Sequence, residues 1–334
     1  MVTYRQVGRG VAQTLRAMDR EARRLERQRI ANEKARQRQA LLEASANAAQ
    51  QYDNTIAALT GAHRIAFQRQ DWLTLATEPS SPPTEPRSDR EEAARRAERL
   101  YHPGWFARTF GFEKRRRAKL AKAVVAAHAA DEADFLERKT ADEAHAEEIV
   151  FAQKVVALEP SALMRALEQH GGLENLPFSA EELAIRYTSE RRLIAIVDGL
   201  DLDDMPEQSV TLLQSGKASF KPLARTRILE LHRDAICSGA VRIALECLRV
   251  LPLDAVEVVM QTDLLDPGSG HIDGRPVLYL RVAAQALEAV VLPRSEAWPL
   301  VERLGGHLDW NKRDGFRSIN LAAFNVPMDA PADA

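Results

Sequence analysis

Apolar and polar residues follow a helical period over most of the first half of the chain. From about Gln6 to Leu75 the sequence is rich in Ala, Arg, Gln, Glu and Leu and contains no Pro, a composition that favours one long helix, with Gly61 as a point where it can be interrupted. Its apolar positions begin as a heptad at Leu15, Met18, Ala22 and Leu25, which Arg29 and Asn32 then interrupt. A parallel two-stranded coiled coil is therefore an open alternative to a single helix.

A proline-rich stretch ends this pattern, and a second helical region follows it. Residues 77–90 contain four prolines, which remove backbone donors and favour extended conformations, so they predict a linker. We expect helices from Glu91 to Leu100, from about residue 113 to Leu158, and from Ser161 to Gln169. Two long helices joined by a linker and an elbow predict an antiparallel helical arm.

After Pro177 the pattern changes to short apolar or alternating runs, which are typical of strands. The predicted strands are Glu182–Thr188, Leu193–Val197, Val210–Leu213, Ala255–Met260 and Pro276–Val282. A helix from Leu223 to Leu251 precedes the last two strands, a Gly-rich turn at Asp266–Gly274 joins them, and a helical end follows at Ser295–Leu304. Segregated helices and strands predict an α+β fold, with antiparallel strands packed on a central helix and no alternating βαβ units.

These patterns give a domain organisation. We predict a long basic helix (1–76), a Pro-rich linker (77–90), a helical region with an aromatic elbow (91–175), an α+β domain (176–325) and a flexible tail (326–334). The elbow is named for its aromatic residues, which we expect to pack together: Tyr101, Trp105, Phe106 and Phe110.

Composition and charge narrow the class of protein. The net charge is −2, but residues 1–40 carry eleven basic and four acidic residues, a local charge of about +7. No stretch approaches the ~18 apolar residues of a membrane span, and no apolar run follows the basic N-terminus as in a secretory signal. Cys237 and Cys247 lie on one predicted helix about 15 Å apart, too far for a disulfide. We therefore expect reduced, buried thiols in a cytoplasmic protein.

Three passages together resemble a family of bacterial proteins that pairs an N-terminal helical or coiled-coil region with a C-terminal α+β domain. They are the stretch from Tyr101 to Gly111 with Arg116 and Arg117, the Ser215-Gly216-Lys217 hairpin with Lys221 and Pro222, and Thr262–Leu278 with Gly270 and His271. The resemblance implies the architecture and carries no activity with it.

Candidate catalytic patterns are incomplete. Gly216-Lys217 lacks the first glycine and the Ser or Thr of a phosphate loop, because Thr211 and Ala218 occupy those positions. The Gly- and Asp-rich turn lacks the alternating oxygen ligands of a calcium loop. A metal-dependent nuclease or hydrolase would use Glu246 with Asp263 and Asp266, but the strand after the turn offers no acid and no Lys. We expect no cofactor and no metal, and Glu230, Arg242 and Glu246 fit either the polar face of a helix or an internal ion pair.

The strongest remaining signal is the basic helical surface. We expect its arginines to contact a partner: Arg20, Arg23, Arg24, Arg27, Arg115, Arg116 and Arg117. The sequence therefore favours a non-enzymatic interaction or scaffold protein that uses its helical arm for self-association or for binding a protein partner. Arg-rich helices also neutralise phosphates, so binding to DNA or RNA is the alternative.

Overall fold

The computed structural model describes residues 4–79, 82, 84–102, 112–176 and 182–326, with side chains from residue 23 onward except those of residues 112 and 175. Its contacts define two compact units. The first comprises Met1–Phe67, Gly172–Cys247 and Asp254–Ala334, and the second comprises Gln68–Gly171 and Leu248–Leu253. Within the described ranges, no helix combines the length and the apolar character that a membrane span requires.

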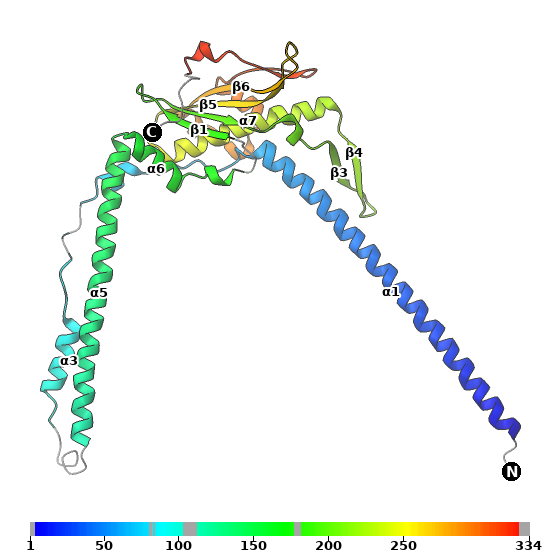
Figure 1. The fold of residues 1–334 in the computed structure, drawn as a ribbon, viewed down its shortest axis with the longest axis horizontal. Coiled ribbons are helices and arrows are strands. Elements are labelled where there is room, and N and C mark those ends of the chain that lie inside the picture. The colour runs from blue at the N-terminus through cyan, green and yellow to red at the C-terminus, as the bar shows by residue number, and fades with distance from the viewer. Residues whose placement is uncertain (1–3, 80–81, 83, 103–111, 177–181, 327–334) are drawn as a thin grey trace. The chain divides into compact units, whose positions relative to one another are not determined.

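A six-stranded sheet forms the centre of the first unit (Figure 1). Its strand order is β1 (Glu182–Tyr187), β2 (Leu193–Asp198), β5 (Ala255–Leu265), β6 (Ile272–Ala283), β7 (His307–Asn311) and β8 (Gly315–Arg317). The predicted α+β class is confirmed, because four of the five strand pairs are antiparallel. The pair β2–β5 is parallel, so one crossover connection interrupts the antiparallel order that we predicted.

That crossover contains α7 (Arg225–Val250), which lies against one face of the sheet (Figure 1). The sheet residues Val258 and Leu280 pair across β5 and β6, as do Met260 and Leu278, and all four are fully buried. The helix contributes its own fully buried side chains, among them Ile236. Burying such side chains stabilises the fold by roughly 1.5–3 kcal/mol each, so this layer is the main core of the unit. Two short helices follow β6, α8 (Ala284–Glu288) and α9 (Ala297–Arg303).

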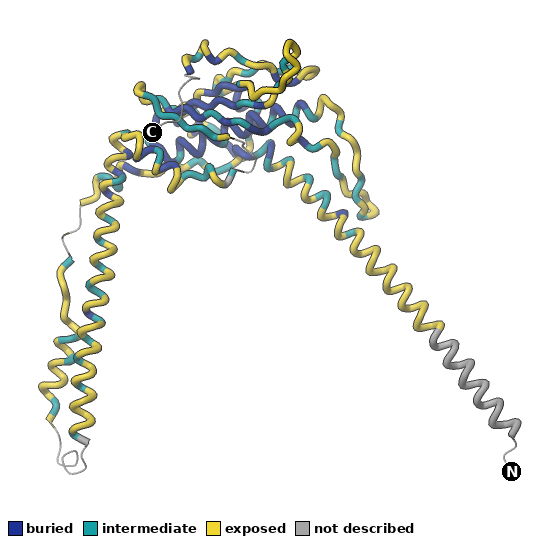
Figure 2. Tube along the Cα trace, in the orientation of Figure 1, coloured by how far each residue is buried: buried dark blue, intermediate teal, exposed yellow. Residues whose placement is uncertain are grey.

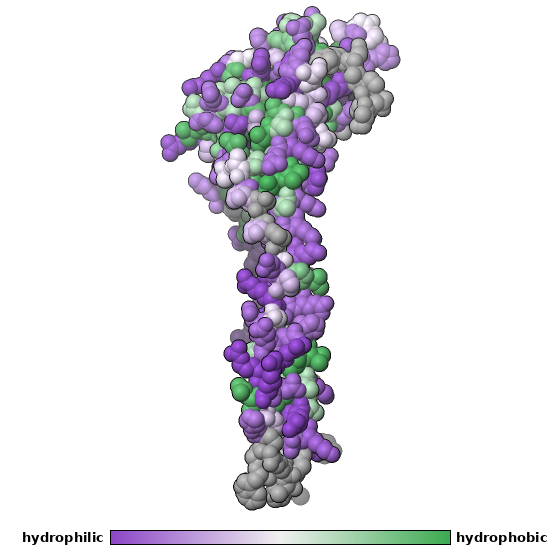
Figure 3. All heavy atoms as spheres, turned by 90° about the vertical axis from the view of Figure 1, so that its left-hand side faces the viewer, coloured by the Kyte–Doolittle hydropathy of each residue, from purple (hydrophilic) through white to green (hydrophobic). Residues whose placement is uncertain are grey.

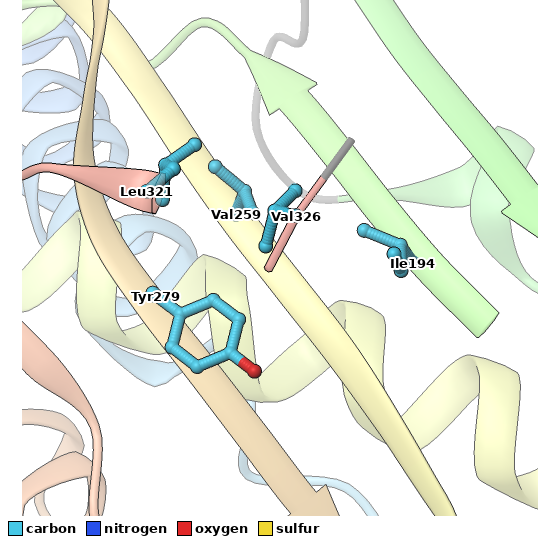
Figure 4. Close-up of a cluster of buried hydrophobic side chains, with 5 residues drawn as sticks. All are labelled: Ile194, Val259, Tyr279, Leu321 and Val326. Atoms are coloured by element: carbon cyan, nitrogen blue, oxygen red, sulfur yellow. The ribbon is translucent and has the colours of Figure 1, made fainter. Parts of the chain in front are cut away.

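The C-terminal segment after β8 packs on the sheet as well. Leu321 and Val326 form a buried cluster with Ile194, Val259 and Tyr279 (Figure 4). The short helix η4 (Leu321–Phe324) carries part of this segment. Of the tail predicted from residue 326 onward, Val326 is thus a buried core residue, and residues 327–334 lie outside the described ranges.

Several element boundaries differ from the sequence-based expectation. The strand β5 continues to Leu265, and β6 begins already at Ile272. The predicted turn at Asp266–Gly274 is therefore shorter than expected. The strands β7 and β8 were not predicted at all. Polar residues occupy three of the five positions of β7, and β8 has only three residues, so neither offers the apolar run by which a strand is recognised.

The first helix, α1 (Tyr4–Gly61), ends earlier than the predicted Leu75. Its last third packs against the two-stranded sheet of β3 (Gln208–Leu212) and β4 (Ala218–Pro222). The turn of this hairpin contains Gly216 with φ +78°, a conformation that glycine adopts without steric cost. A Cβ atom there would lie 2.9 Å from Cδ2 of Leu42, so the turn also needs glycine for its approach to α1.

The second unit is helical. It contains α2 (Trp72–Ala76), α3 (Asp89–Arg99), α5 (Phe112–Val156) and α6 (Pro160–His170). The short helix α3 runs antiparallel to α5 and packs against it (Figure 1). The predicted antiparallel arm of the two long helices stays a prediction. The Arg90 guanidinium lies 2.7 Å from the Asp134 carboxylate, and the Glu91 backbone N–H donates to Asp131 at 2.9 Å. Figure 3 shows this helical pair with a mostly hydrophilic surface and separate apolar side chains.

A small aromatic core joins α2 to the C-terminal turns of α5. Trp72 is buried and meets Phe151 edge-on, with ring centroids 5.7 Å apart, and His170 at 5.2 Å. Its indole N–H donates to the backbone oxygen of Val250, which also belongs to this unit. The buried side chains of Val155 and Leu163 continue the core toward α6.

Candidate interaction surface

Residues 23–40 of α1 are all exposed (Figure 2). They include the predicted contact residues Arg23, Arg24 and Arg27, whereas the side chain of Arg20 lies outside those described. This stretch holds seven basic and two acidic residues, a net charge of +5. Leu25 and Ile30 are exposed on it too, so the surface offers apolar contacts among the positive charges.

The exposed stretch continues from the packed end of the same helix, which fixes it in place. Near its C-terminal end, Leu59 and Ala62 are buried in the first unit. His63 follows, with its Nδ1 atom 2.9 Å from the Ser238 hydroxyl and its Nε2 atom 3.2 Å from the Ser295 carbonyl oxygen. Helix propagation from an anchored end costs less than forming a new helix. The core therefore fixes one end of α1, and strong helix formers continue the helix away from it.

The second predicted basic cluster begins α5. Arg115, Arg116 and Arg117 are exposed, and Arg117 pairs with Glu113 at 2.9 Å, an i,i+4 interaction. Of the predicted elbow, Tyr101 is half-buried. Trp105, Phe106 and Phe110 lie outside the described residues, so the proposed packing of the elbow stays a prediction.

The three carboxylates of the nuclease alternative have separate local roles. Glu246 is buried, lies 2.8 Å from the guanidinium of Arg242 as an internal ion pair, and accepts from the Gly172 N–H at 3.2 Å. The Asp266 carboxylate accepts from the Gly268 N–H at 2.8 Å, which lowers the pKa of Asp266 and shapes the turn. The Asp263 backbone N–H donates to Asp201 at 2.7 Å. These contacts place Glu246 on a helix, Asp266 in a turn and Asp263 near the end of a strand.

A different set of polar residues gathers at the carboxyl end of β2. The Asp201 carboxylate accepts from the Thr262 hydroxyl at 2.7 Å, and His232 donates from Nε2 to the Leu200 carbonyl at 2.7 Å. Burial, together with the nearby Asp201 and Asp263, raises the pKa of Asp198. The cluster was not recognised in the sequence, because its members come from β2, the following loop, β5 and α7. Among the residues that the structure describes, no three His, Cys, Asp or Glu side chains are placed to hold a metal ion.

In comparisons with protein-family models, with curated proteins and with solved structures, nothing matches this chain. The resemblance drawn from residues 101–117, 215–222 and 262–278 therefore stays a hypothesis.

Proposed function

We propose that the chain is a non-enzymatic interaction protein and that α1 is its docking element. The observation that supports this proposal is the run of eighteen consecutive exposed residues, 23–40, with a net charge of +5. Most helical stability in proteins comes from packing of one face, and this stretch has exposed apolar side chains at Leu25 and Ile30. A partner that covers this surface would supply the missing packing.

The charge of α1 specifies the kind of partner. Two α1 helices in parallel would place like charges side by side, which is unfavourable at low salt. An acidic protein surface is complementary to it. The chain itself carries one on α5, where residues 132–148 hold seven acidic and two basic residues, none of them buried. Self-association in our proposal therefore joins α1 of one copy to α5 of another, and an acidic surface of a different protein is the other form of the same interaction.

Light scattering of the purified chain at low and high salt tests self-association. We expect a mass above that of the monomer at about 50 mM salt and a decrease toward the monomer as salt screens the charges. A chain that lacks residues 1–40 should stay monomeric. The deletion stops there because Leu59, Ala62 and Trp72 are buried and longer truncations would remove core residues.

Matched double variants identify the surface. Arg24→Gln with Arg27→Gln should weaken association, whereas Arg96→Gln with Arg99→Gln, on exposed positions of α3, should leave it unchanged. Fluorescein-labelled poly-glutamate serves as the probe for an acidic partner of another kind. A monomer at every salt concentration that also fails to bind poly-glutamate would remove the proposal, and so would equal losses in the two double variants.

A second candidate function is binding to DNA or RNA. The observation that favours it is the second exposed basic cluster, Arg115–Arg117, in addition to the basic stretch of α1. Phosphate contacts give a steep salt dependence, so fluorescence anisotropy of a labelled oligonucleotide over a salt series is a direct measurement. Loss of binding in Arg115→Gln with Arg116→Gln would support it. Absence of binding at about 50 mM salt would exclude it.

We also propose a cytoplasmic location. The support is chemical: Cys237 and Cys247 are free and buried in α7, and burial raises the pKa of Cys247 to about 12. Such thiols are inert packing residues, as expected in a reducing compartment. Fluorescence microscopy of a tagged full-length chain tests the location.

A further inference from the structure

The helical unit contains a groove of about 1030 Å³ between α2, α5 and α6. Its apolar lining includes Trp72, Leu75, Val150, Phe151 and Ala162. Side chains from all three helices converge on it, and all of them belong to the second unit. A volume near 1,000 Å³ with a mainly apolar lining is at the upper end of the range of small-molecule sites.

Two cations line this groove. Lys154 on α5 and Arg165 on α6 are exposed, and neither makes an ion pair with a residue that the structure describes. The Arg165 guanidinium carbon lies 4.9 Å from the centroid of the Phe151 ring. This contact orients the guanidinium on the aromatic surface and leaves its N–H donors available to an anion.

The groove is polarised along α5. Glu147 and Glu148 line it as well, and Lys154 follows them about two helical turns later. The Glu148 carboxylate lies 3.8 Å from Nδ1 of His145. An acidic group bound in the groove is therefore favoured near Lys154 and Arg165 and disfavoured at the other end, which gives a ligand a defined direction.

We infer that this groove binds a small amphiphilic anion. The apolar or aromatic body of the ligand lies on Leu75, Val150 and Phe151, and its anionic group pairs with Lys154 and Arg165. Apolar burial supplies the affinity, and the two cations select the charge and the orientation. This inference does not depend on α1 or on the proposed function.

Two fluorescent probes of nearly the same shape test the inference on the full chain. Anilinonaphthalene sulfonate carries one negative charge, and N-phenyl-1-naphthylamine is the same ring system without it. We expect the anionic probe to bind more tightly than the neutral probe. Lys154→Gln with Arg165→Gln should lower the affinity for the anionic probe by about tenfold and change the affinity for the neutral probe little. Each partly exposed ion pair contributes up to about fivefold in affinity.

Matched variants on α5 locate the binding. Lys119→Gln with Lys122→Gln removes two exposed cations away from the groove and should not change either probe. Val150→Asp, at a position that is 50% exposed and lines the groove, should weaken the binding of both probes. Val125→Asp, at a 69% exposed position, should weaken the binding of neither. Circular dichroism confirms that each variant is folded before titration.

Several results would overturn the inference. Equal affinity for the two probes would show that the groove does not select an anion. Equal effects of the 154/165 and 119/122 pairs would assign the charge dependence to the positive charge of the helical unit as a whole. Equal effects of Val150→Asp and Val125→Asp would place the apolar contact elsewhere.

Discussion

Arg192 and Glu257 form a bidentate ion pair in the first unit, beside the C-terminal segment that follows β8. The guanidinium nitrogens Nε and Nη2 lie 2.8 and 2.6 Å from the two oxygens of the Glu257 carboxylate. Tyr279 donates its hydroxyl to the same carboxylate at 3.1 Å, and burial together with this charge raises the pKa of Tyr279 to about 12. Arg192 also donates to the backbone oxygens of Asn325 and Phe324, so one side chain connects β5 to the segment that covers the sheet.

We predict that Arg192→Met destabilises the first unit by about 3 kcal/mol, because it leaves the buried Glu257 carboxylate with Tyr279 as its remaining side-chain donor. The double variant Arg192→Met with Glu257→Met should lose less than the single variant, since no buried charge remains without a partner. Urea unfolding followed by circular dichroism measures both. Glu190→Gln, at an exposed carboxylate 3.7 Å from Arg192, is the control and should change stability by less than about 0.5 kcal/mol.

The aromatic core of the helical unit gives a second prediction. Trp72→Ala should destabilise this unit by about 3–5 kcal/mol, because Trp72 is 2% exposed and packs on Phe151 and His170. Leu73→Ala, next to it but 63% exposed, should cost less than about 0.5 kcal/mol. Limited proteolysis at residues 68–171 reports the local stability of this unit. Equal protection in the two variants would contradict the packing described.

The adjacent glycines 305 and 306 separate backbone strain from close packing. Gly305 has φ +79° and open space around a Cβ position, so Gly305→Ala should cost about 1–2 kcal/mol from strain alone. A Cβ atom on Gly306 would lie 2.4 Å from Cγ1 of the buried Val301, so Gly306→Ala should cost about 1–3 kcal/mol by overpacking.

Shortening Val301 distinguishes these two causes. Val301→Ala should reduce the cost of Gly306→Ala and leave the cost of Gly305→Ala unchanged. Thermal unfolding of the three single variants and the two double variants with Val301→Ala measures this coupling. If the stability costs of Gly306→Ala and Val301→Ala simply add in the double variant, the contact with Val301 is not the cause of the loss at residue 306.

Residue patterns predict this fold where neighbouring residues determine it and fail where distant segments meet. The helix Arg225–Val250 and the central strands were recognisable because their apolar residues recur with the period of the element. The parallel pairing of β2 with β5 depends on the path of the crossover, which leaves no local pattern. The Arg192–Glu257 pair joins residues 65 apart, and the groove cations Lys154 and Arg165 belong to two helices. The exposure of residues 23–40 was predictable from their charge, and α1 ends at Gly61, the position where an interruption of the helix was expected.

Two buried histidines predict how the stability of the first unit depends on pH. Burial lowers the pKa of His63, which lies between Ser238 and the Ser295 carbonyl, with a further lowering by Arg64. Burial also lowers the pKa of His232, although the Leu200 carbonyl, Asp201 and Asp204 act in the opposite direction. In both cases the folded chain holds the neutral ring more strongly than the unfolded chain does.

The sign of the pH dependence follows from this difference. Because the unfolded histidines bind protons near pH 6.5 and the folded ones bind them only at lower pH, stability is fully present above about pH 6.5 and falls as the pH decreases below it. Each histidine contributes a slope of at most about 1.4 kcal/mol per pH unit. Urea unfolding from pH 5.5 to 8 should therefore show lower stability at the acid end. His63→Gln and His232→Gln should each flatten the slope, whereas His271→Gln, on the exposed β5–β6 turn, should not. A slope that all three variants share with the unaltered chain would assign the pH dependence to titrating groups other than these histidines.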